Sequence, residues 1–517
     1  MPKVLGRRGV ILLVALLTLG CLKVGPDFQR PSTTVADTWL DIGDNRLATA
    51  SVEHRHWWQA FRDPALNRLI DTAYRENLSL RLAGVRVLEA RAQLGVAIGE
   101  WFPQTQQAFG AMDKIRVSDR SPQAVFNRNL NYRQSELGLR ASWELDFWGK
   151  YRRGIESADA SLKATVADYD SALVSLTGDV ATSYILIRTL EKRLDIARQN
   201  VATQEESLKI AQSKFQGGTT SQRDVEQAKT ILGNTLATIP ALEIQLRQGK
   251  NALCVLLGQA PSHLTHLLGE AAPIPAPPPQ VAVGIPADLL RRRPDVRAAE
   301  LKAAAQCAAI GVAKADLFPS FSLLGTFSFQ ASDVARFALG DMFRWGARTA
   351  NVGPSFQWSI LNYGQITNQV RVQDARFQEL LISYQQTVLK AQQEVEDALT
   401  GFLRSQVRAQ LLGDSVAAAR RSLNLAVLQY REGITDFTTV LTAQQSLLNE
   451  QDSLATALGD IARYLVGVYR ALGGGWQLRE GRDFIPEEVR AEMARRTNWG
   501  RLLTPAALTT TERKQGD

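Results

Sequence analysis

The chain repeats itself after 215 residues, and this internal repeat limits its possible folds more than any other feature. Matching positions in a single register are Trp143 and Trp358, Gly149 and Gly364, Tyr169 and Tyr384, Gly218 and Gly433, and Leu257-Gly258 and Leu472-Gly473. A repeat of this length indicates two copies of one structural unit. The copies share apolar residues and turns but no set of catalytic residues. The repeat therefore predicts a duplicated architecture, not a duplicated active site.

Long helices are the strongest local prediction in each copy. Apolar residues follow a coiled-coil spacing along the first copy, at Leu162, Val166, Tyr169, Leu173, Leu176, Val180, Tyr184, Ile187, Leu190 and Leu194. No proline interrupts 151–215 or 365–430, and a helix of that size would be about 95 Å long. A glycine-containing turn and a second helix follow, near 222–258 and 438–472. Each copy therefore predicts a long helical hairpin, which is typical of a tube or a rod. An ordinary helical bundle remains the alternative.

Alternating apolar and polar residues predict β-strands between the first helix of each copy and its hairpin. The alternation is clear over 136–147, 321–330 and 351–360, and weaker over 104–115. Strands of about ten residues with aromatic side chains on the apolar face fit a transmembrane β-barrel. A half-buried sheet in a protein outside the membrane fits these strands nearly as well.

Four strands in one chain cannot close a barrel, and lipid does not tolerate open sheet edges. Two chains would supply eight strands, which leave little room for a pore. Three chains would supply twelve strands around a channel. If the strands cross a membrane, we therefore expect a homotrimer with a mixed α/β fold, in which a 12-stranded barrel continues into a long coiled-coil barrel of helices.

The N-terminus reads as a targeting segment. Lys3, Arg7 and Arg8 precede an apolar run over 10–19, which is too short to span a bilayer. Cys21 follows this run and resembles the acylated cysteine of a bacterial lipoprotein, although Thr18 stands where such proteins usually have leucine. We therefore expect a signal peptide over 1–20 and a covalent lipid (palmitate) on Cys21, with no other cofactor.

Other chemistry is weakly supported. The net charge is +8 and its positive residues are interspersed with acidic ones, so no nucleic-acid surface is predicted. The four histidines form two short pairs without the further ligands that a zinc site needs. Cys254 and Cys307 lie in helical patterns and are expected to be inert core residues. No phosphate-binding loop or catalytic motif is present, so the chain is not expected to be an enzyme.

The predicted organisation has six parts. They are a signal peptide (1–20), an extended leader (21–64), a first repeat (65–258), a proline-rich linker (259–286), a second repeat (287–473) and a C-terminal tail (474–517). Each repeat is expected to contain a helix, two strands and a long helical hairpin.

Short motifs add a family resemblance to this pattern. They are Gly25-Pro26-Asp27-Phe28 after Cys21, Trp57-Trp58 with Phe61-Arg62-Asp63-Pro64, and Arg292-Arg293-Pro294-Asp295-Val296. Together with the duplicated hairpins, they resemble the TolC-type outer-membrane efflux proteins over nearly the whole chain. The resemblance is to the NodT lineage of lipoproteins that serve RND pumps.

This resemblance implies an outer-membrane exit duct of a tripartite efflux system, anchored in outer-membrane lipid and extending into the periplasm. A periplasmic adaptor (membrane fusion protein) and an inner-membrane RND pump would be its partners, and small molecules such as drugs its cargo. The exit duct of a type I secretion system and a periplasmic scaffold without a pore remain the alternatives. The sequence does not indicate which substrate is exported.

The resemblance also implies two groups of functional residues. The adaptor-docking tips are expected at Gly218, Thr219 and Thr220 and at Gly433, Ile434 and Thr435. The aperture latch is expected from a bond between Asp224 and Tyr430, while Thr439 and Thr442 occupy positions where related channels often carry an aspartate ring. Asp224 and Asp436 have a simpler interpretation as residues near helix starts.

Overall fold

A computed structural model describes residues 22–48, 55–122, 130–278, 280–284, 286, 292–334 and 338–503. The expected signal peptide and the acylated Cys21 lie outside these residues. The chain forms two compact units. One, the sheet unit, contains Met1–Pro31, Glu89–Ala164 and Ala299–Ser383, and the other, the helical unit, contains Ser32–Leu88, Thr165–Ala298 and Tyr384–Asp517.

The structure repeats as the sequence does. Helices α4 (Lys150–Gln216) and α9 (Gln365–Arg431) have 67 residues each, and α5 (Gln222–Leu256) and α10 (Phe437–Ala471) have 35 each. Each helix of the second copy begins and ends 215 residues after its counterpart. The shorter helices α3 (Leu78–Gly99) and α8 (Pro294–Ala315) match in the same way, with 22 residues each. The two predicted hairpins are thus confirmed.

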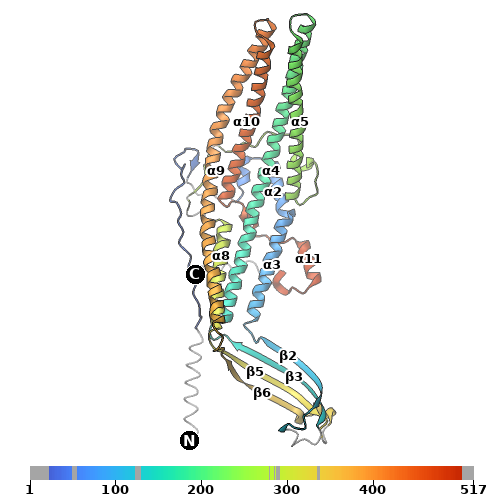
Figure 1. Cartoon of the computed structure of the whole chain (residues 1–517), viewed down its shortest axis with the longest axis vertical. Helices are drawn as coiled ribbons and strands as arrows, with labels where there is room; N and C mark the ends of the chain where they lie inside the picture. The colour runs from blue at the N-terminus through green and yellow to red at the C-terminus, as the bar shows by residue number, and fades with distance from the viewer. Residues whose placement is uncertain are drawn as a thin grey trace. The chain divides into compact units, whose positions relative to one another are not determined.

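Four antiparallel strands form the main sheet, in the order β2-β3-β5-β6 (Figure 1). Their bounds are Thr105–Arg116 for β2, Asn131–Leu145 for β3, Ser320–Ser332 for β5 and Arg348–Gln357 for β6. They coincide with the four predicted strand segments. Within this sheet β2 and β6 are the edges, and each pairs on one side only.

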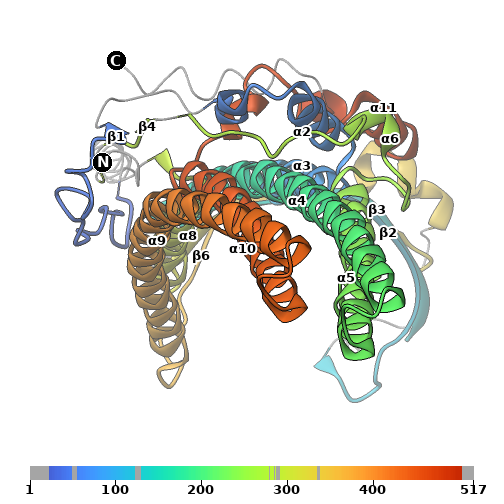
Figure 2. The same cartoon turned by 90° about the horizontal axis from the view of Figure 1, so that it is seen from above.

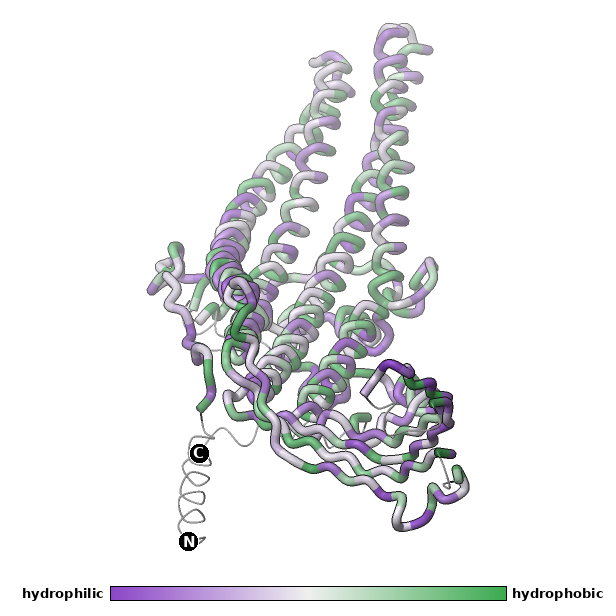
Figure 3. Tube along the Cα trace, turned by 60° about the horizontal axis from the view of Figure 1, so that its bottom comes forward, coloured by the Kyte–Doolittle hydropathy of each residue, from purple (hydrophilic) through white to green (hydrophobic). Residues whose placement is uncertain are grey.

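The register of the sheet separates an apolar face from a polar face. Leu139 pairs with Ala108 and Phe327, and Phe327 also pairs with Ala350, so one face is apolar across all four strands. The next residue along β3, Arg140, pairs with Gln107 and Thr326. Because directly paired residues point to the same side, the alternation seen in each strand becomes one amphipathic sheet. The same alternation of hydropathy is visible along the strands in Figure 3.

In the helical unit, the long helices lie side by side in the order α9, α10, α4 and α5 (Figure 2). The stripe of apolar residues predicted on α4 is buried here, with Leu173, Val180, Tyr184 and Ile187 fully inaccessible. The helical stretch predicted at 65–101 is two helices, α2 (Pro64–Glu76) and α3, because Asn77 is extended between them. The Asn77 side chain accepts a hydrogen bond from the Leu80 amide (2.8 Å) and donates one to the Leu256 carbonyl (2.9 Å).

The leader and the linker meet in the helical unit. Strand β1 (Leu47–Ala48) of the leader pairs in parallel with β4 (Val281–Ala282) of the linker. Further along the leader, the short helix η2 (Trp57–Phe61) buries both of its tryptophans, and the Trp57 ring stacks on Tyr469 at 5.3 Å. The linker also contains the short helix α6 (Thr265–Leu268).

The C-terminal segment is folded through residue 503, which differs from the polar tail expected over 474–517. It contains η6 (Trp476–Arg479), α11 (Glu487–Arg496) and η7 (Gly500–Leu503). Arg479 donates a 2.6 Å hydrogen bond to the buried carboxylate of Asp170, while Ile485 and Met493 pack against Leu88. These few apolar anchors are spaced too widely in a polar segment to be recognised from periodicity. In the part of the chain that the structure describes, no helix is both long and apolar enough to cross a membrane.

Candidate functional site at the hairpin tips

The first predicted tip is a compact turn between α4 and α5. Gly218 has a φ of 70°, a left-handed conformation that glycine adopts without a steric penalty. Its amide donates to the Phe215 carbonyl (3.0 Å), and the Thr219 amide donates to the Lys214 carbonyl (2.9 Å). This pair of bonds is the Schellman motif, which satisfies carbonyls at the end of a helix.

The second predicted tip has the same geometry. Gly433 has a φ of 78°, its amide donates to the Tyr430 carbonyl (3.2 Å), and the Ile434 amide donates to the Gln429 carbonyl (2.9 Å). The Ile434 side chain is 74% exposed. The six residues expected at the tips therefore lie at the two turns, and their role in docking an adaptor stays a prediction.

Asp224 lies at the start of α5, where 8% of its surface is exposed. Its carboxylate accepts hydrogen bonds from the hydroxyls of Thr220 and Ser221, the latter at 3.3 Å. The Arg223 guanidinium is 3.7 Å away. All of these partners belong to the same turn as Asp224, as the simpler interpretation of a carboxylate near a helix start requires.

Tyr430, the expected partner of Asp224, is 5% exposed near the end of α9. Its ring packs against Phe437 with 5.0 Å between the ring centres. Among the described residues its hydroxyl has no hydrogen-bond partner, so the expected bond to Asp224 is not formed here. Burial raises the pKa of Tyr430, and the nearby Asp224 carboxylate adds to this shift. Whether the pair acts as a latch stays a prediction.

Thr439 and Thr442 lie on the first turns of α10. The Thr439 amide (3.1 Å) and hydroxyl (2.8 Å) both donate to the Asp436 carboxylate, which caps the helix. These hydrogen bonds lower the pKa of Asp436. Thr439 and Thr442 line a pocket of about 410 Å³ between α9 and α10, together with small residues such as Ser422 and Ala443. The wall at these positions is therefore built from hydroxyl and methyl groups, with the Asp436 carboxylate at its edge.

An apolar cluster joins the two hairpins below their tips. It is made by Ala211 of α4, Val225 and Ala228 of α5, Leu423, Ala426 and Tyr430 of α9, and Phe437, Val440, Leu441, Ala443 and Leu447 of α10. Since residues from all four helices contribute, the cluster holds the two hairpins together near the tips.

Lys214 is a contact between the hairpins that the sequence interpretation missed. Its ammonium group, at the end of α4, donates to the carbonyl of Tyr430 and lies 3.4 Å from the carbonyl of Arg431. The same ammonium nitrogen is 4.2 Å from the centre of the Tyr430 ring. A sequence signal exists, because the repeat places Gln429 at the position equivalent to Lys214. The duplicated pattern thus breaks at a cation.

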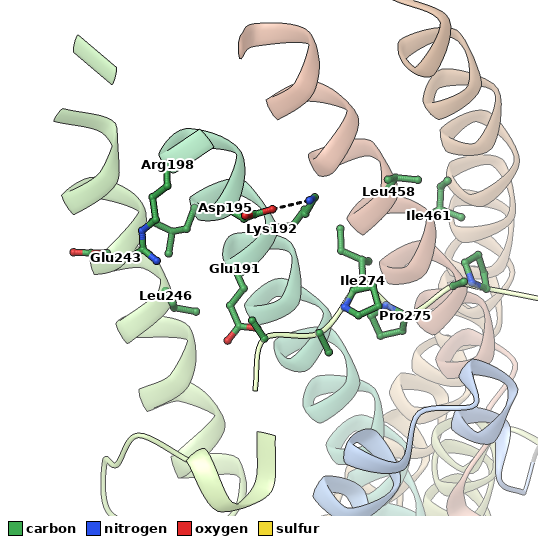
Figure 4. A pocket seen from close by; sticks show the side chains of 16 residues that line it. Glu191, Lys192, Asp195, Arg198, Glu243, Leu246, Ile274, Pro275, Leu458 and Ile461 are labelled. Carbon is green, nitrogen blue, oxygen red and sulfur yellow. Dashed lines mark hydrogen bonds and ion pairs between the residues drawn. The ribbon is translucent and has the colours of Figure 1, made fainter. Parts of the chain in front are cut away.

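A second pocket, of about 820 Å³, lies in the helical unit between α4, α5, α10 and linker residues 271–277 (Figure 4). Its charged residues are already paired with one another. Lys192 contacts Asp195 (2.8 Å), and Arg198 contacts Glu243 (3.1 Å). Such pairing leaves no free charge aimed at a ligand, so the pocket is not assigned a binding role.

The comparisons with known proteins agree with this architecture. The family model described as "Outer membrane efflux protein" matches residues 69–259 and 285–474. Nodulation protein T of Rhizobium leguminosarum bv. trifolii is 30% identical over 467 residues, covering 89% of this chain and 96% of that protein. The toluene efflux pump outer membrane protein TtgI of Pseudomonas putida is 32% identical over 483 residues, covering 90% and 98%.

A solved structure extends the comparison to the fold. The outer-membrane channel OprN superimposes with a TM-score of 0.82 at 34% sequence identity, and the match covers 88% of this chain and 100% of that one. The matched regions contain both hairpins, the sheet and both tips. The chain therefore belongs to the outer membrane efflux protein family.

Proposed function

We propose that this protein is the exit duct of a tripartite RND-type efflux system, which passes small molecules such as drugs through the periplasm and the outer membrane. The observation that supports this most directly is the joining of two duplicated helical hairpins to one amphipathic four-stranded sheet. Its relatives include a toluene efflux pump outer membrane protein, and they are channels rather than enzymes.

The sheet edges support a closed barrel made by three copies. In the described sheet the outer sides of β2 and β6 are unpaired, and unpaired backbone groups are not tolerated in lipid. Because all neighbouring pairs are antiparallel, β2 and β6 run in opposite directions. The β6 edge of one copy can therefore join the β2 edge of the next in the same antiparallel pattern. Three copies would close a 12-stranded wall, with the apolar face toward lipid and the polar face toward water.

Exposed apolar side chains on the long helices support the same assembly. On α9 they include Val407, Leu411, Leu425 and Leu428, with spacings of four, fourteen and three residues. Spacings of this kind place side chains on one helix face, as in a coiled coil. On α5 the exposed apolar residues include Leu236 and Ile244. Neighbouring copies of the chain would cover these surfaces.

The remaining parts of the proposal concern the anchor and the partners. A covalent lipid on Cys21 would hold the trimer in the outer membrane, while the hairpin tips would reach a periplasmic adaptor that connects to an inner-membrane RND pump. The exposed Ile434 and the hydroxyls of Thr219 and Thr435 give the tips a surface suited to such a partner.

Conductance tests the duct. The purified protein in a planar lipid bilayer should give discrete current steps, whereas a scaffold without a pore would give none. In cells, deletion of the protein should increase sensitivity to small toxic compounds. If deletion instead abolished secretion of a protein and left drug sensitivity unchanged, the type I secretion alternative would replace this one.

Docking can be tested separately from conduction. Ile434→Asp places a charge at an exposed tip position, so the trimer and its current steps should persist while drug resistance is lost. Ile434→Leu is the matched control and should retain resistance. Full resistance with Ile434→Asp would exclude Ile434 from the docking surface.

A further inference from the structure

The two hairpins are joined by polar contacts that follow a heptad along α4. Arg193, Asn200, Ser207 and Lys214 are spaced seven residues apart, so they lie on one face of the helix. Figure 2 shows that α10 is the neighbour of α4. The interface between the hairpins is therefore marked by a polar residue at every second turn.

Each of these four residues contacts the second hairpin. Arg193 donates to Asp452 at 2.7 and 3.0 Å, Asn200 donates to Gln451 at 2.9 Å, and Ser207 accepts from Gln444 at 2.6 Å. Lys214 is the last of the series and the one nearest the tips. It contacts the end of α9 instead of α10.

The contact of Lys214 combines two favourable interactions. Carbonyls in the last turn of a helix carry partial negative charge and lack intrahelical partners, so a cation there is stabilising. The ammonium group also lies over the face of the Tyr430 ring, which attracts cations. Both interactions depend on the second hairpin, although Lys214 belongs to the first.

Asp224 differs from Lys214 in this respect. Its hydrogen bonds come from Thr220 and Ser221 in its own turn. They would survive if the two hairpins separated, whereas every contact of Lys214 described above would break. The apolar cluster around Tyr430 holds the hairpins together without directional bonds, so Lys214 supplies the specific contact at this level.

We propose that Lys214 is the latch between the hairpins: its ammonium group holds the C-terminal end of α9 against α4, and this contact must break before the tips move apart. This inference rests on the proposed function as a duct. It assigns the latch to the backbone carbonyls and ring face of Tyr430, and not to the Tyr430 hydroxyl.

The test is a set of purified full-length variants compared by single-channel recording. Lys214→Met keeps the length of the side chain but removes its charge, and it should raise the open probability roughly tenfold, the scale expected when a charged hydrogen bond is lost. Lys214→Arg keeps the cation and should resemble the unmodified protein. Lys209→Met is the matched control, since Lys209 is an exposed lysine on the same helix.

Tyr430→Phe separates the two latch assignments. It keeps the ring and the carbonyl, so a latch made by Lys214 should stay closed. A latch made by Asp224 and the Tyr430 hydroxyl should open. Asp224→Ala should raise the open probability less than Lys214→Met does.

Spin labels at positions 219 and 434 give a second readout that does not depend on current. Their mean distance should increase in Lys214→Met and in Lys214→Gln, but not in Lys209→Met. Unchanged distance and current in both Lys214 variants would overturn the proposal, as would opening by Tyr430→Phe. If the unmodified protein formed folded trimers that conducted no current, the duct function itself would be excluded, and the latch with it.

Discussion

At the scale of single residues, buried polar side chains explain why short motifs stand where they do. Asp63 caps α2 by accepting from the Ala65 amide (2.8 Å), and Pro64 occupies the first helical position. The hydroxyl of the buried Tyr184 donates to Asp63 (2.6 Å), and the Arg188 guanidinium donates to the same hydroxyl (3.1 Å). Burial and the bond to Asp63 raise the pKa of Tyr184 to about 12. The Asp-Pro pair therefore begins a helix and fixes it to α4.

Replacing Asp63 should destabilise the helical unit measurably. Asp63→Ala removes a helix cap, which costs about 1 kcal/mol, and takes the carboxylate acceptor away from a buried hydroxyl, which costs about 1–3 kcal/mol more. Thermal unfolding followed by circular dichroism in detergent would measure the loss. Asp71→Ala, at an exposed position on the same helix, should change the free energy of unfolding by no more than about 0.5 kcal/mol. Equal unfolding curves for the two variants would contradict this role of Asp63.

At the scale of elements, the ends of the long helices are held by segments distant in sequence. Arg293, from the Arg-Arg-Pro-Asp motif, is buried and donates to the carbonyl of Ala471 at the end of α10 (2.7 Å) and to Glu394 of α9 (2.7 Å). The leader is attached to α9 in a related way, since Arg46 donates to the Leu403 carbonyl and to Gln406, both at 3.2 Å. An arginine that ties backbone carbonyls to side chains thus fixes one element to another in both cases.

The attachment of the leader should depend on pH. Hydrogen bonds from Arg46 lower the pKa of Asp44 to about 2, from an ordinary value of 3.8. Because the folded pKa is the lower one, the contribution of this pair is complete above pH 3.8 and is lost as the pH falls toward 2. Amide hydrogen exchange of residues 40–48, corrected for its intrinsic pH dependence, should therefore accelerate below pH 3.8.

A neutral variant should reproduce this effect without acid. Asp44→Asn should show fast exchange of the same segment already at pH 7, while Asp37→Asn, at an exposed position of the leader, should not. Protection that is equal at pH 5 and pH 2.5 would show that Asp44 does not hold the leader.

At the scale of the whole molecule, one chain leaves surfaces that only further copies can cover. The outer sides of β2 and β6 are unpaired in the described sheet, and apolar side chains are exposed along α5 and α9. Both features have the same physical cause, because backbone groups in lipid and apolar groups in water each require a partner. An assembly of three chains would satisfy both requirements together.

The purified protein should accordingly behave as a trimer. Its protein mass in detergent should be three times the 57.0 kDa of the chain with any signal peptide retained, and correspondingly less after cleavage. An unheated sample should migrate as an oligomer on a denaturing gel, and boiling should convert it to the monomer. A monomeric sample without β signal in circular dichroism would contradict the barrel.

The sequence alone was sufficient for the duplicated hairpins, the four strands and the glycine turns. These features depend on local spacing: seven-residue and two-residue periodicities define helices and strands, and a left-handed turn requires a residue such as Gly218 or Gly433. The comparisons with known proteins then confirmed the family that the short motifs indicated.

Only the tertiary structure decided which distant residues meet. Lys214 reaches Tyr430, Arg479 reaches Asp170, and β1 of the leader pairs with β4 of the linker. It also placed the hydrogen bonds of Asp224 within its own turn. A lone lysine or aspartate has no periodicity, and its partner is set by how helices separated by hundreds of residues pack. That packing is a property of the folded chain, which is why the contact between the hairpins could not be read from the order of the residues.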